Sequence, residues 1–438
     1  MQQRRSHKKS RRGCLNCKKW HTKCDESGPP CNNCTLRNAH CEYAWAKEGK
    51  MTALVEARKS PASSSRSSNS TSTGNPAEGS LMEPGGLVVK ECRRLLELEL
   101  MHHWSTTTYK SLCTVPEDHQ YMQLLMPQEA MRYDFLLNGI FVASALHRST
   151  TVAESEAKGY FNVAMELYDR ASRSFRTHLR KMDPATHHVL YIFSSMTAFI
   201  NIAFSQCNFS EGSELNTLST VAVAFDLLNG SVNIAITDFQ RLLDSPVPIR
   251  AYLNYGFATT VALYPDTQAA ITRLAHLNEI YHSAPYQGAT PSDELSVATS
   301  SSFSDAVSTV STTPPSGPWD AVIALLRHCF AEEQRDILRG FCFVFPGGAG
   351  PDFTAAIKAF DPMALLILMH WAVLIDRVGD EFWWTKKLGV RLAIGIWKAL
   401  QIFGHKSTSP ALQTPEWGES ILWACTQLGI PKLAQTQG

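Results

Sequence analysis

The sequence lacks both a large excess of charge of either sign and a long apolar run. Its 438 residues contain 41 Lys and Arg against 40 Asp and Glu, a formal net charge of +1. The longest unbroken apolar run, near Ala364–Met369, is too short for a membrane-spanning helix, and four polar residues interrupt the apolar stretch Val189–Phe204. We therefore expect a soluble protein of two to three domains with no membrane partner.

A secretory signal is also lacking, because the first twelve residues are polar and basic with no apolar segment. This absence favours a reducing compartment, where clustered cysteines are more often a metal site than a disulfide framework. Six of the twelve cysteines lie between residues 14 and 41. The other six are scattered singly: Cys92, Cys113, Cys207, Cys329, Cys342 and Cys425.

The balanced total charge conceals two very different parts. Residues 1–50 carry twelve Lys and Arg and four acids, a net charge of +8, whereas the remaining 388 residues carry 29 basic and 36 acidic residues, a net charge of −7. Such an asymmetry indicates a nucleic-acid-binding head on a mildly acidic body.

The body is expected to be all-α, because sustained strand alternation is lacking and apolar residues recur at helical spacing from Leu87 onward. The predicted helices are Leu87–Tyr109, Gln128–His147, Ala153–Leu179, Ala185–Phe204, Leu215–Leu228, Ile234–Leu243, Ile249–Leu263, Gln268–Tyr281, Trp319–Leu338, Phe353–Ala359, Pro362–Arg377, Trp383–Phe403 and Glu416–Leu428. Tyr133–His147 and Met363–Val373 are expected to be core helices rather than ligand-lining ones. Two segments are expected to be disordered: residues 60–80 contain nine Ser, and residues 299–313 contain ten Ser or Thr.

The clustered cysteines follow the spacing C-x2-C-x6-C-x6-C-x2-C-x6-C, which is one three-cysteine unit repeated. The candidate ligands are Cys14, Cys17, Cys24, Cys31, Cys34 and Cys41. A tetrahedral zinc ion needs four thiolates, so six can serve two ions only if two sulfurs are shared. The alternative is a single zinc ion on Cys14, Cys17, Cys31 and Cys34, which leaves the duplicated spacing without a cause.

This segment has almost no apolar material around which to fold. Between Cys14 and Cys41 the only sizeable apolar side chains are Leu15, Trp20 and Leu36. Metal ligation must therefore supply the folding free energy, on the order of 10 kcal/mol for small zinc modules.

Basic residues surround the cysteines and predict contact with DNA phosphates. Nine Lys and Arg and no acid lie between Arg4 and Lys23. Lys18, Lys19 and Lys23 are expected on a first short helix held by Cys17 and Cys24. Arg11 and Arg12 belong to a basic arm suited both to phosphate contact and to nuclear import.

The cluster resembles the fungal six-cysteine binuclear zinc cluster transcription factors. The matching text is Arg11-Arg12-Gly13-Cys14-Leu15-Asn16-Cys17-Lys18, then Lys23-Cys24-Asp25, Pro29, Cys31, Cys34 and Cys41. The resemblance implies two zinc ions bridged by Cys14 and Cys31, and a turn at Pro29 that joins two short helices related by pseudo-symmetry. It also implies double-stranded DNA as partner and the nucleus as location.

Two features depart from the family pattern. Family members usually have Lys or Arg at the third and fourth positions after the second cysteine, where they read a CGG triplet, and this chain has Trp20 and His21. Both remain candidate DNA contacts, with His21 as a donor to a guanine edge. Many relatives also continue into a coiled coil, but residues 44–59 show no run of heptads, which leaves dimerisation open.

The body resembles one branch of the family, which includes the sterol uptake control regulators. The stretches that carry this likeness are Leu96–Trp104, Tyr133–His147, Tyr160–Leu179 and Ala364–Leu374 followed by Trp383-Trp384. The resemblance implies a regulatory domain that contacts co-regulators or a small apolar ligand, and control of a metabolic or secondary-metabolite gene set.

The predicted organisation is a small zinc module joined by a disordered linker to an all-α regulatory domain. Its segments are a basic arm (1–13), the zinc cluster (14–43), a Ser-rich linker (44–86), a helical domain (87–284), a disordered insertion (285–318) and the C-terminal helical part (319–430). The alternative functions are a receptor for a sterol or other apolar metabolite, with DNA binding as its output, and a zinc-dependent protein adaptor. No nucleophile–base pair or cofactor loop is evident in the sequence, so an enzyme is not expected.

Overall fold

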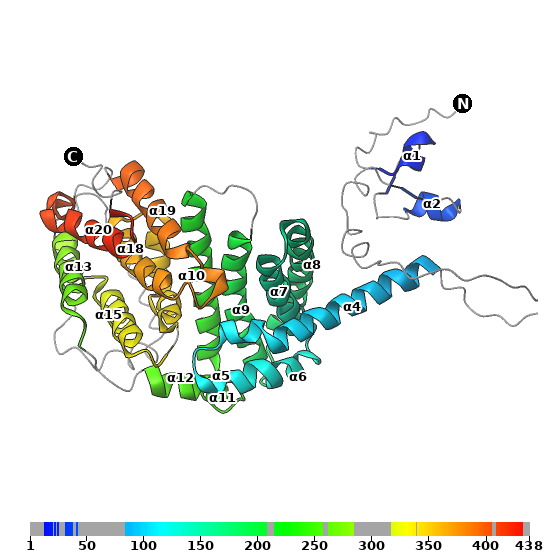
Figure 1. Ribbon diagram of the computed structural model, residues 1–438, viewed down its shortest axis with the longest axis horizontal. Coiled ribbons are helices and arrows are strands. Elements are labelled where there is room, and N and C mark those ends of the chain that lie inside the picture. The colour runs from blue at the N-terminus through cyan, green and yellow to red at the C-terminus, as the bar shows by residue number, and fades with distance from the viewer. Residues whose placement is uncertain are drawn as a thin grey trace, which may run out of the picture. The chain divides into compact units, whose positions relative to one another are not determined.

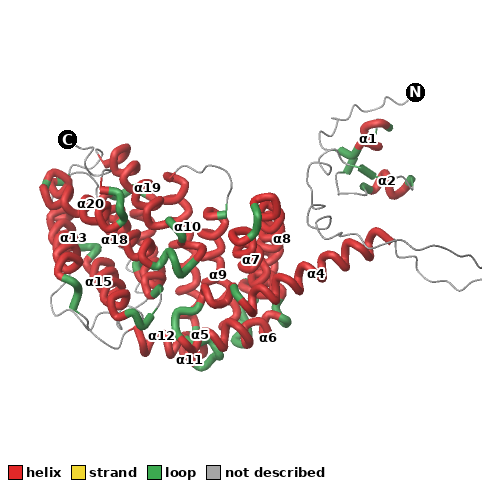
Figure 2. The backbone as a smooth tube through the Cα atoms, in the orientation of Figure 1, coloured by secondary structure: helices red, strands yellow, loops and turns green. Residues whose placement is uncertain are grey.

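The computed structural model describes residues 13–20, 22, 24–25, 31–37, 41–42, 84–207, 214–256, 262–283, 317–338, 340–404 and 409–431. The chain divides into two compact units, Met1–Cys92 and Arg93–Gly438. Most of the predicted linker 44–86 and of the predicted insertion 285–318 lies outside the described residues. All regular structure within the described ranges is helical, which confirms the mostly-α class (Figure 2).

The N-terminal unit contains two helices of five residues each, and the body contains the rest. The helices of the N-terminal unit are α1 (Leu15–Lys19) and α2 (Asn32–Leu36). A long helix, α4 (Pro84–Thr106), begins at the end of the predicted linker and continues into the body.

The helices of the body follow one another with short connections (Figure 1). Up to residue 283 they are η2 (Thr108–Leu112), α5 (Pro116–Gln120), η3 (Tyr121–Leu125), α6 (Met126–Ala130), α7 (Asp134–Thr151), α8 (Glu154–Leu179), α9 (His187–Gln206), α10 (Glu214–Thr237), α11 (Phe239–Leu243), α12 (Ile249–Gly256) and α13 (Pro265–Ser283). From residue 320 they are α15 (Asp320–Arg335), η5 (Phe341–Val344), α16 (Phe345–Gly348), α17 (Gly350–Lys358), α18 (Pro362–Arg377), η6 (Trp383–Thr385), α19 (Leu388–Phe403), η8 (Pro410–Gln413) and α20 (Pro415–Gln427).

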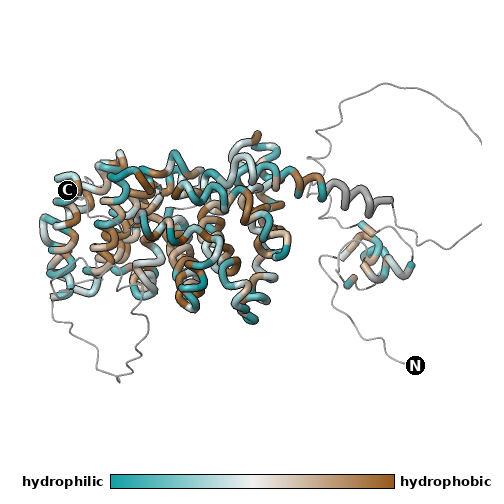
Figure 3. The backbone as a smooth tube through the Cα atoms, turned by 90° about the horizontal axis from the view of Figure 1, so that it is seen from below, coloured by the Kyte–Doolittle hydropathy of each residue, from teal (hydrophilic) through white to brown (hydrophobic). Residues whose placement is uncertain are grey.

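Three antiparallel neighbours along the chain form the framework of the body. Helix α7 packs along α8, α9 along α10, and α18 along α19, while α10 also packs on α19 and so joins the two halves of the body. Figure 3 shows apolar segments on helices throughout the body, alternating with hydrophilic ones. The core is therefore continuous across the segment 284–316, which lies outside the described residues.

Helix α18 is the most deeply buried element of the body. Every residue from Pro362 to Ile375 is buried, including His370. The Asp361 carboxylate caps the helix by accepting from the Ala364 N–H at 2.8 Å. A helix that is apolar on every side can only be stable inside a core, so the prediction for Met363–Val373 is confirmed.

Helix α10 differs from the prediction of two separate helices in this region. It runs without interruption from Glu214 to Thr237 across Gly230, where the sequence predicts a break after Leu228. A glycine costs a helix about 1 kcal/mol relative to alanine. Packing of α10 against α9 and α19 compensates for this weakness.

By length and composition alone, α9 and α10 qualify as membrane spans, and α17 with α18, bent by 105°, would count as a third. This differs from the expectation drawn from Val189–Phe204. Within the fold, α9 and α10 lie against one another and pair their polar groups. Ser195 Oγ and Ser231 Oγ are 2.5 Å apart, and His187 Nε2 donates to the Ile234 carbonyl at 2.7 Å.

The close approach of α18 and α19 depends on Gly389. A Cβ at this position would overlap the Ala372 carbonyl oxygen and lie 2.8 Å from the Asp376 nitrogen. We expect Gly389→Ala to lower the free energy of unfolding by about 1–3 kcal/mol, because two packed helices must move apart. Urea denaturation of the full chain, followed by tryptophan fluorescence, measures the effect.

The matched control is Gly418→Ala in α20, where a Cβ would meet nothing within 4 Å. This change should raise the free energy of unfolding by about 0.5–1 kcal/mol, since alanine is the better helix former. A Gly389→Ala midpoint equal to that of the wild type would contradict the close packing of these helices.

Candidate metal centre and nucleic-acid interface

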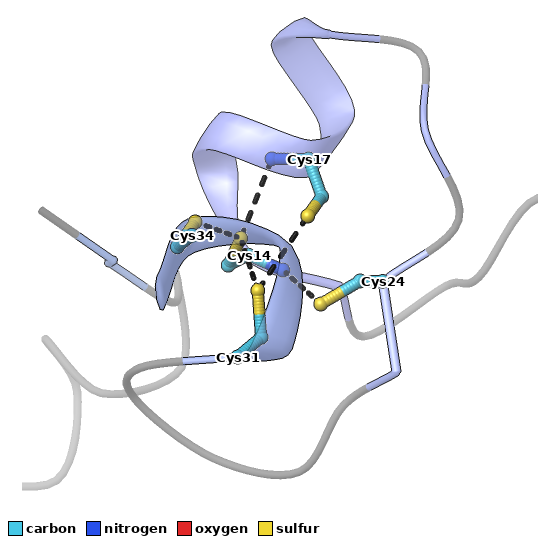
Figure 4. Close-up of a cluster of buried hydrophobic side chains, with 5 residues drawn as sticks. All are labelled: Cys14, Cys17, Cys24, Cys31 and Cys34. Atoms are coloured by element: carbon cyan, nitrogen blue, oxygen red, sulfur yellow. Dashed lines mark hydrogen bonds between the residues drawn. The ribbon is translucent and has the colours of Figure 1, made fainter. Parts of the chain in front are cut away.

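The six clustered cysteines lie together in the N-terminal unit. Cys14, Cys17, Cys31 and Cys34 have no exposed surface, Cys24 is buried and Cys41 is half-buried. Figure 4 shows five of these side chains, with the Cys14 sulfur at the centre. All six thiols are free rather than paired in disulfides.

The sulfurs form two groups of four that share two members. One group is Cys14, Cys17, Cys24 and Cys31, the other is Cys14, Cys31, Cys34 and Cys41, and the ligand atoms of each group lie within 4.8 Å of one another. The shared residues, Cys14 and Cys31, are those that the family resemblance implies as bridging ligands. The four-cysteine alternative uses neither Cys24 nor Cys41, yet both are brought into these groups.

The spacing of the sulfurs matches zinc coordination. The Cys14 Sγ–Cys31 Sγ distance is 3.7 Å, and the Cys14–Cys34 and Cys17–Cys31 distances are both 3.6 Å. A tetrahedral site with Zn–S bonds of about 2.3 Å has sulfur–sulfur edges of roughly 3.8 Å, whereas a disulfide would be near 2 Å. The donor set therefore fits two zinc ions.

A repeat of 17 residues governs the backbone around the sulfurs. Cys14 precedes α1 and Cys31 precedes α2, each with extended backbone. The Cys14 N–H donates to Cys24 Sγ at 3.5 Å, and the Cys31 N–H donates to Cys41 Sγ at 3.3 Å. The same contact is thus made twice, which is the pseudo-symmetry expected from the duplicated spacing.

The two shared thiols differ electrostatically from their neighbours. Burial alone would raise the pKa of Cys14, but the Cys17 N–H, which donates to its sulfur at 3.3 Å, and the neighbouring thiols lower it below its usual value. The pKa of Cys31 is lowered in the same way. Burial raises the pKa of Cys17 to about 12 and also raises that of Cys41, so cationic zinc is needed to hold these groups as thiolates.

Two of the predicted DNA contacts are held in a defined position. Lys18 and Lys19 occupy the last turn of α1, and both are exposed. The helix is anchored at Cys14 and Cys17, so the two ammonium groups are presented from a rigid support. Four other predicted contacts lie outside the described residues: Arg11, Arg12, His21 and Lys23.

Helix α1 ends earlier than the sequence predicts. Its last residue is Lys19, and Trp20 is the C-terminal cap. The Thr22 N–H then donates to the Cys17 carbonyl at 3.0 Å, outside the helix. The expectation that Lys23 lies on α1 is therefore wrong, because the chain must turn back to bring Cys24 to the cluster.

Trp20 is occupied by a contact that the sequence did not predict. Its half-buried ring packs against the cysteine cluster, and the Arg37 guanidinium carbon lies 4.8 Å from the ring centroid. Such a cation–π contact is worth about 0.5–1 kcal/mol at an exposed site. The 17-residue repeat contains the missed signal, since Trp20 and Arg37 occupy equivalent positions in the two halves.

The body contains a second candidate site, a cavity of about 350 Å³. Its lining is mainly apolar and aromatic, and it includes Phe199, Phe225, Tyr252, Phe343 and Trp384. This volume lies within the usual range of roughly 300–1,000 Å³ for small-molecule sites. The hydrogen-bonded Ser195–Ser231 pair is among the few polar groups in the lining.

The fold and site thus define a binuclear zinc–thiolate module linked to a helical body. The family model of the fungal Zn(2)-Cys(6) binuclear cluster domain matches residues 12–50. The chain carries a domain of this family, and the domain's cofactor is a pair of zinc ions in a six-thiolate cluster.

Similarity to known proteins extends beyond this domain. The chain is 30% identical over 183 residues to a Zn(2)-C6 fungal-type transcription factor of Gibberella zeae, which covers 34% of this chain and 37% of the relative. It is 30% identical over 179 residues to the Zn(2)-C6 fungal-type transcription factor afumD of Aspergillus fumigatus, which covers 40% and 41%. The chain therefore spans about two fifths of the length of these curated relatives.

A shorter match involves proteins with a sterol-related name. The chain is 52% identical over 40 residues to Sterol uptake control protein 2 of Candida albicans, covering 9% of this chain and 6% of that protein. The protein of the same name from Saccharomyces cerevisiae is 48% identical over 40 residues, covering 9% and 4%.

Zinc stoichiometry distinguishes the shared-sulfur cluster from the four-cysteine alternative. We expect two zinc ions per wild-type chain and a loss of zinc in Cys24→Ser, because Cys24 completes one of the four-sulfur groups. Elemental analysis of the purified full chain gives the metal content. Cys113→Ser is the control, since Cys113 lies in the body, where its Sγ donates to the Tyr109 carbonyl at 3.2 Å and a serine can do the same.

One zinc ion per wild-type chain, retained in full by Cys24→Ser, would support the four-cysteine site and contradict the shared cluster.

Proposed function

We propose that this protein is a nuclear, sequence-specific DNA-binding regulator of transcription. The observation that carries the proposal is the pair of exposed lysines, Lys18 and Lys19, on a helix fixed by the zinc ligands Cys14 and Cys17. The match of residues 12–50 to the fungal cluster domain and the two relatives named as transcription factors support it.

Phosphate contact supplies most of the affinity in this proposal. The basic charge of residues 1–50 neutralises DNA phosphates and releases condensed counterions, so binding weakens steeply with salt. Lys18 and Lys19 hold α1 against the backbone, while Arg11, Arg12 and Lys23 add charge beside it. Base reading falls to His21, which follows α1 closely and can donate to a guanine edge.

The helical body sets the output of the DNA-binding head. Its partners are co-regulators or the transcription machinery, and its target genes are a metabolic or secondary-metabolite set. The names of the curated relatives support this assignment by likeness only.

Selection from a pool of randomised duplexes by the full-length chain, with and without a zinc chelator, tests the proposal. We expect selection of a defined sequence that the chelator abolishes, because the module folds only around its metal. In the same assay, His21→Ala should relax base preference, whereas Lys19→Ala should weaken all sites similarly and lower the salt slope by about one. Arg132→Ala, which removes an exposed arginine of α6–α7, is the control and should change neither property.

Two results would count against this function. If the zinc-loaded chain selects no sequence at physiological salt, the protein adaptor is the better interpretation. If His21→Ala leaves base preference unchanged, the assignment of His21 as the reading residue is wrong.

A second candidate function is the sensing of an apolar metabolite, and the cavity in the body favours it. The cavity lies between α9, α10 and α12 and the η5–α16 and η6 segments, and its aromatic lining suits a ligand with few polar groups. Binding there would bias the packing of α9 against α10 and so couple a metabolite to the body's output.

Filling the cavity tests this candidate. Ala224 lies in the lining and is buried, whereas its neighbour Val223 is 42% exposed on the other side of α10. We expect the wild type and Val223→Phe to bind a tritium-labelled sterol saturably in equilibrium dialysis, and Ala224→Phe to lose most of this binding. Equal binding by the two variants, both confirmed as folded by thermal unfolding, would exclude the cavity as a sterol site.

A further inference from the structure

The two halves of the zinc cluster meet through a pair of equivalent residues that differ in chemistry. Trp20 caps the C-terminus of α1 and Arg37 caps the C-terminus of α2, and the two positions are 17 residues apart. The Arg37 guanidinium lies over the Trp20 ring at 4.8 Å. The contact therefore joins the end of one short helix to the end of the other.

The second helix is poor in charge compared with the first. Lys18 and Lys19 of α1 correspond to Thr35 and Leu36 of α2, so Arg37 is the one basic residue between Cys31 and Cys41. Stacking on Trp20 draws this cation toward the C-terminal end of α1, where the two lysines already lie. The contact thus gathers the charge of both halves at one end of α1.

Arg37 has the properties of a phosphate contact. Its side chain is exposed, and within the described part of the chain it forms no ion pair with a carboxylate. A guanidinium held over an aromatic ring keeps N–H donors at its edge, in a planar fork that suits two phosphate oxygens. The stack also restricts the rotamers of a long side chain before DNA binds, which lowers the entropy lost on binding.

We propose that Arg37 is part of the DNA phosphate-binding surface formed by α1, and that Trp20 is the residue that positions it. This inference rests on the proposed DNA-binding function and extends it to the second half of the cluster. Trp20 then acts through Arg37 and the packing of the cluster, and it does not read a base itself.

The experiment compares salt-dependent DNA binding of the full-length wild-type chain with that of Arg37→Ala, Arg37→Lys, Trp20→Ala, Trp20→Phe and the double alanine variant. The DNA is the duplex selected by the wild type, the salt concentration spans 50–200 mM, and zinc content is measured for each variant. Arg37→Ala should weaken binding roughly two- to tenfold and lower the salt slope by about one. Arg37→Lys should keep the slope, because lysine retains the charge.

The role of Trp20 is measured by a double-mutant cycle on DNA affinity. If Trp20 acts through Arg37, Trp20→Ala should weaken binding at full zinc content, and the double variant should be no weaker than Arg37→Ala alone. Trp20→Phe should retain most of the affinity, because a phenyl ring still attracts a cation. Should Trp20→Ala lose zinc, the comparison of Trp20→Phe with Arg37→Ala still tests the coupling.

Three results would overturn parts of this inference. An unchanged salt slope in Arg37→Ala would show that Arg37 contacts no phosphate. Additive losses from the two alanine variants would remove Trp20 as its positioning residue. Absence of salt-dependent DNA binding by the wild type would instead refute the proposed function, and Lys19→Ala, measured in parallel, separates these cases.

Discussion

The coordination of zinc by shared thiolates is the constraint on which the N-terminal module depends. Six cysteines lie within 28 residues that contain only three sizeable apolar side chains, so burial of apolar surface cannot fold this segment. The sulfurs take over the role of a core: five of them are fully or almost fully buried, and backbone N–H groups donate to those of Cys14, Cys24 and Cys41. Removing the metal would leave buried thiols whose pKa values favour the neutral form at several positions, with nothing else to hold the two halves together.

The cluster also determines where the positive charge lies. A charge of +8 on residues 1–50 would have little directional value on an unstructured chain. The N-terminal caps at Cys14 and Cys31 fix two short helices, and these fix Lys18, Lys19 and, through Trp20, the Arg37 guanidinium. Metal binding and DNA binding are thus connected by a few residues of rigid backbone, and the acidic body is left to regulate rather than to bind DNA.

Much of this organisation could be predicted from the sequence, because the strongest signals are local. The cysteine spacing predicted the grouped thiols, and the apolar periodicity predicted the all-α body and the buried helix α18. The errors come from tertiary effects that periodicity does not contain. Packing against α9 and α19 carries α10 through Gly230, and the return of the chain to Cys24 ends α1 before Lys23.

The two unforeseen candidate features have the same origin. The cavity is enclosed by segments as far apart in the chain as Trp104 and Leu388, and no local pattern specifies the space left between them. The Trp20–Arg37 contact joins two helix ends that meet only because the two halves share Cys14 and Cys31. The internal repeat could have suggested that pair, but only the folded cluster shows that the side chains touch.

X-ray absorption at the zinc edge of the full-length protein tests the central claim most directly. Sharing of Cys14 and Cys31 predicts four sulfur neighbours per zinc at about 2.3 Å and a second zinc as a further scattering shell. Nitrogen or oxygen ligands in the coordination sphere, or the absence of a zinc–zinc shell, would contradict a six-thiolate cluster with two bridging sulfurs.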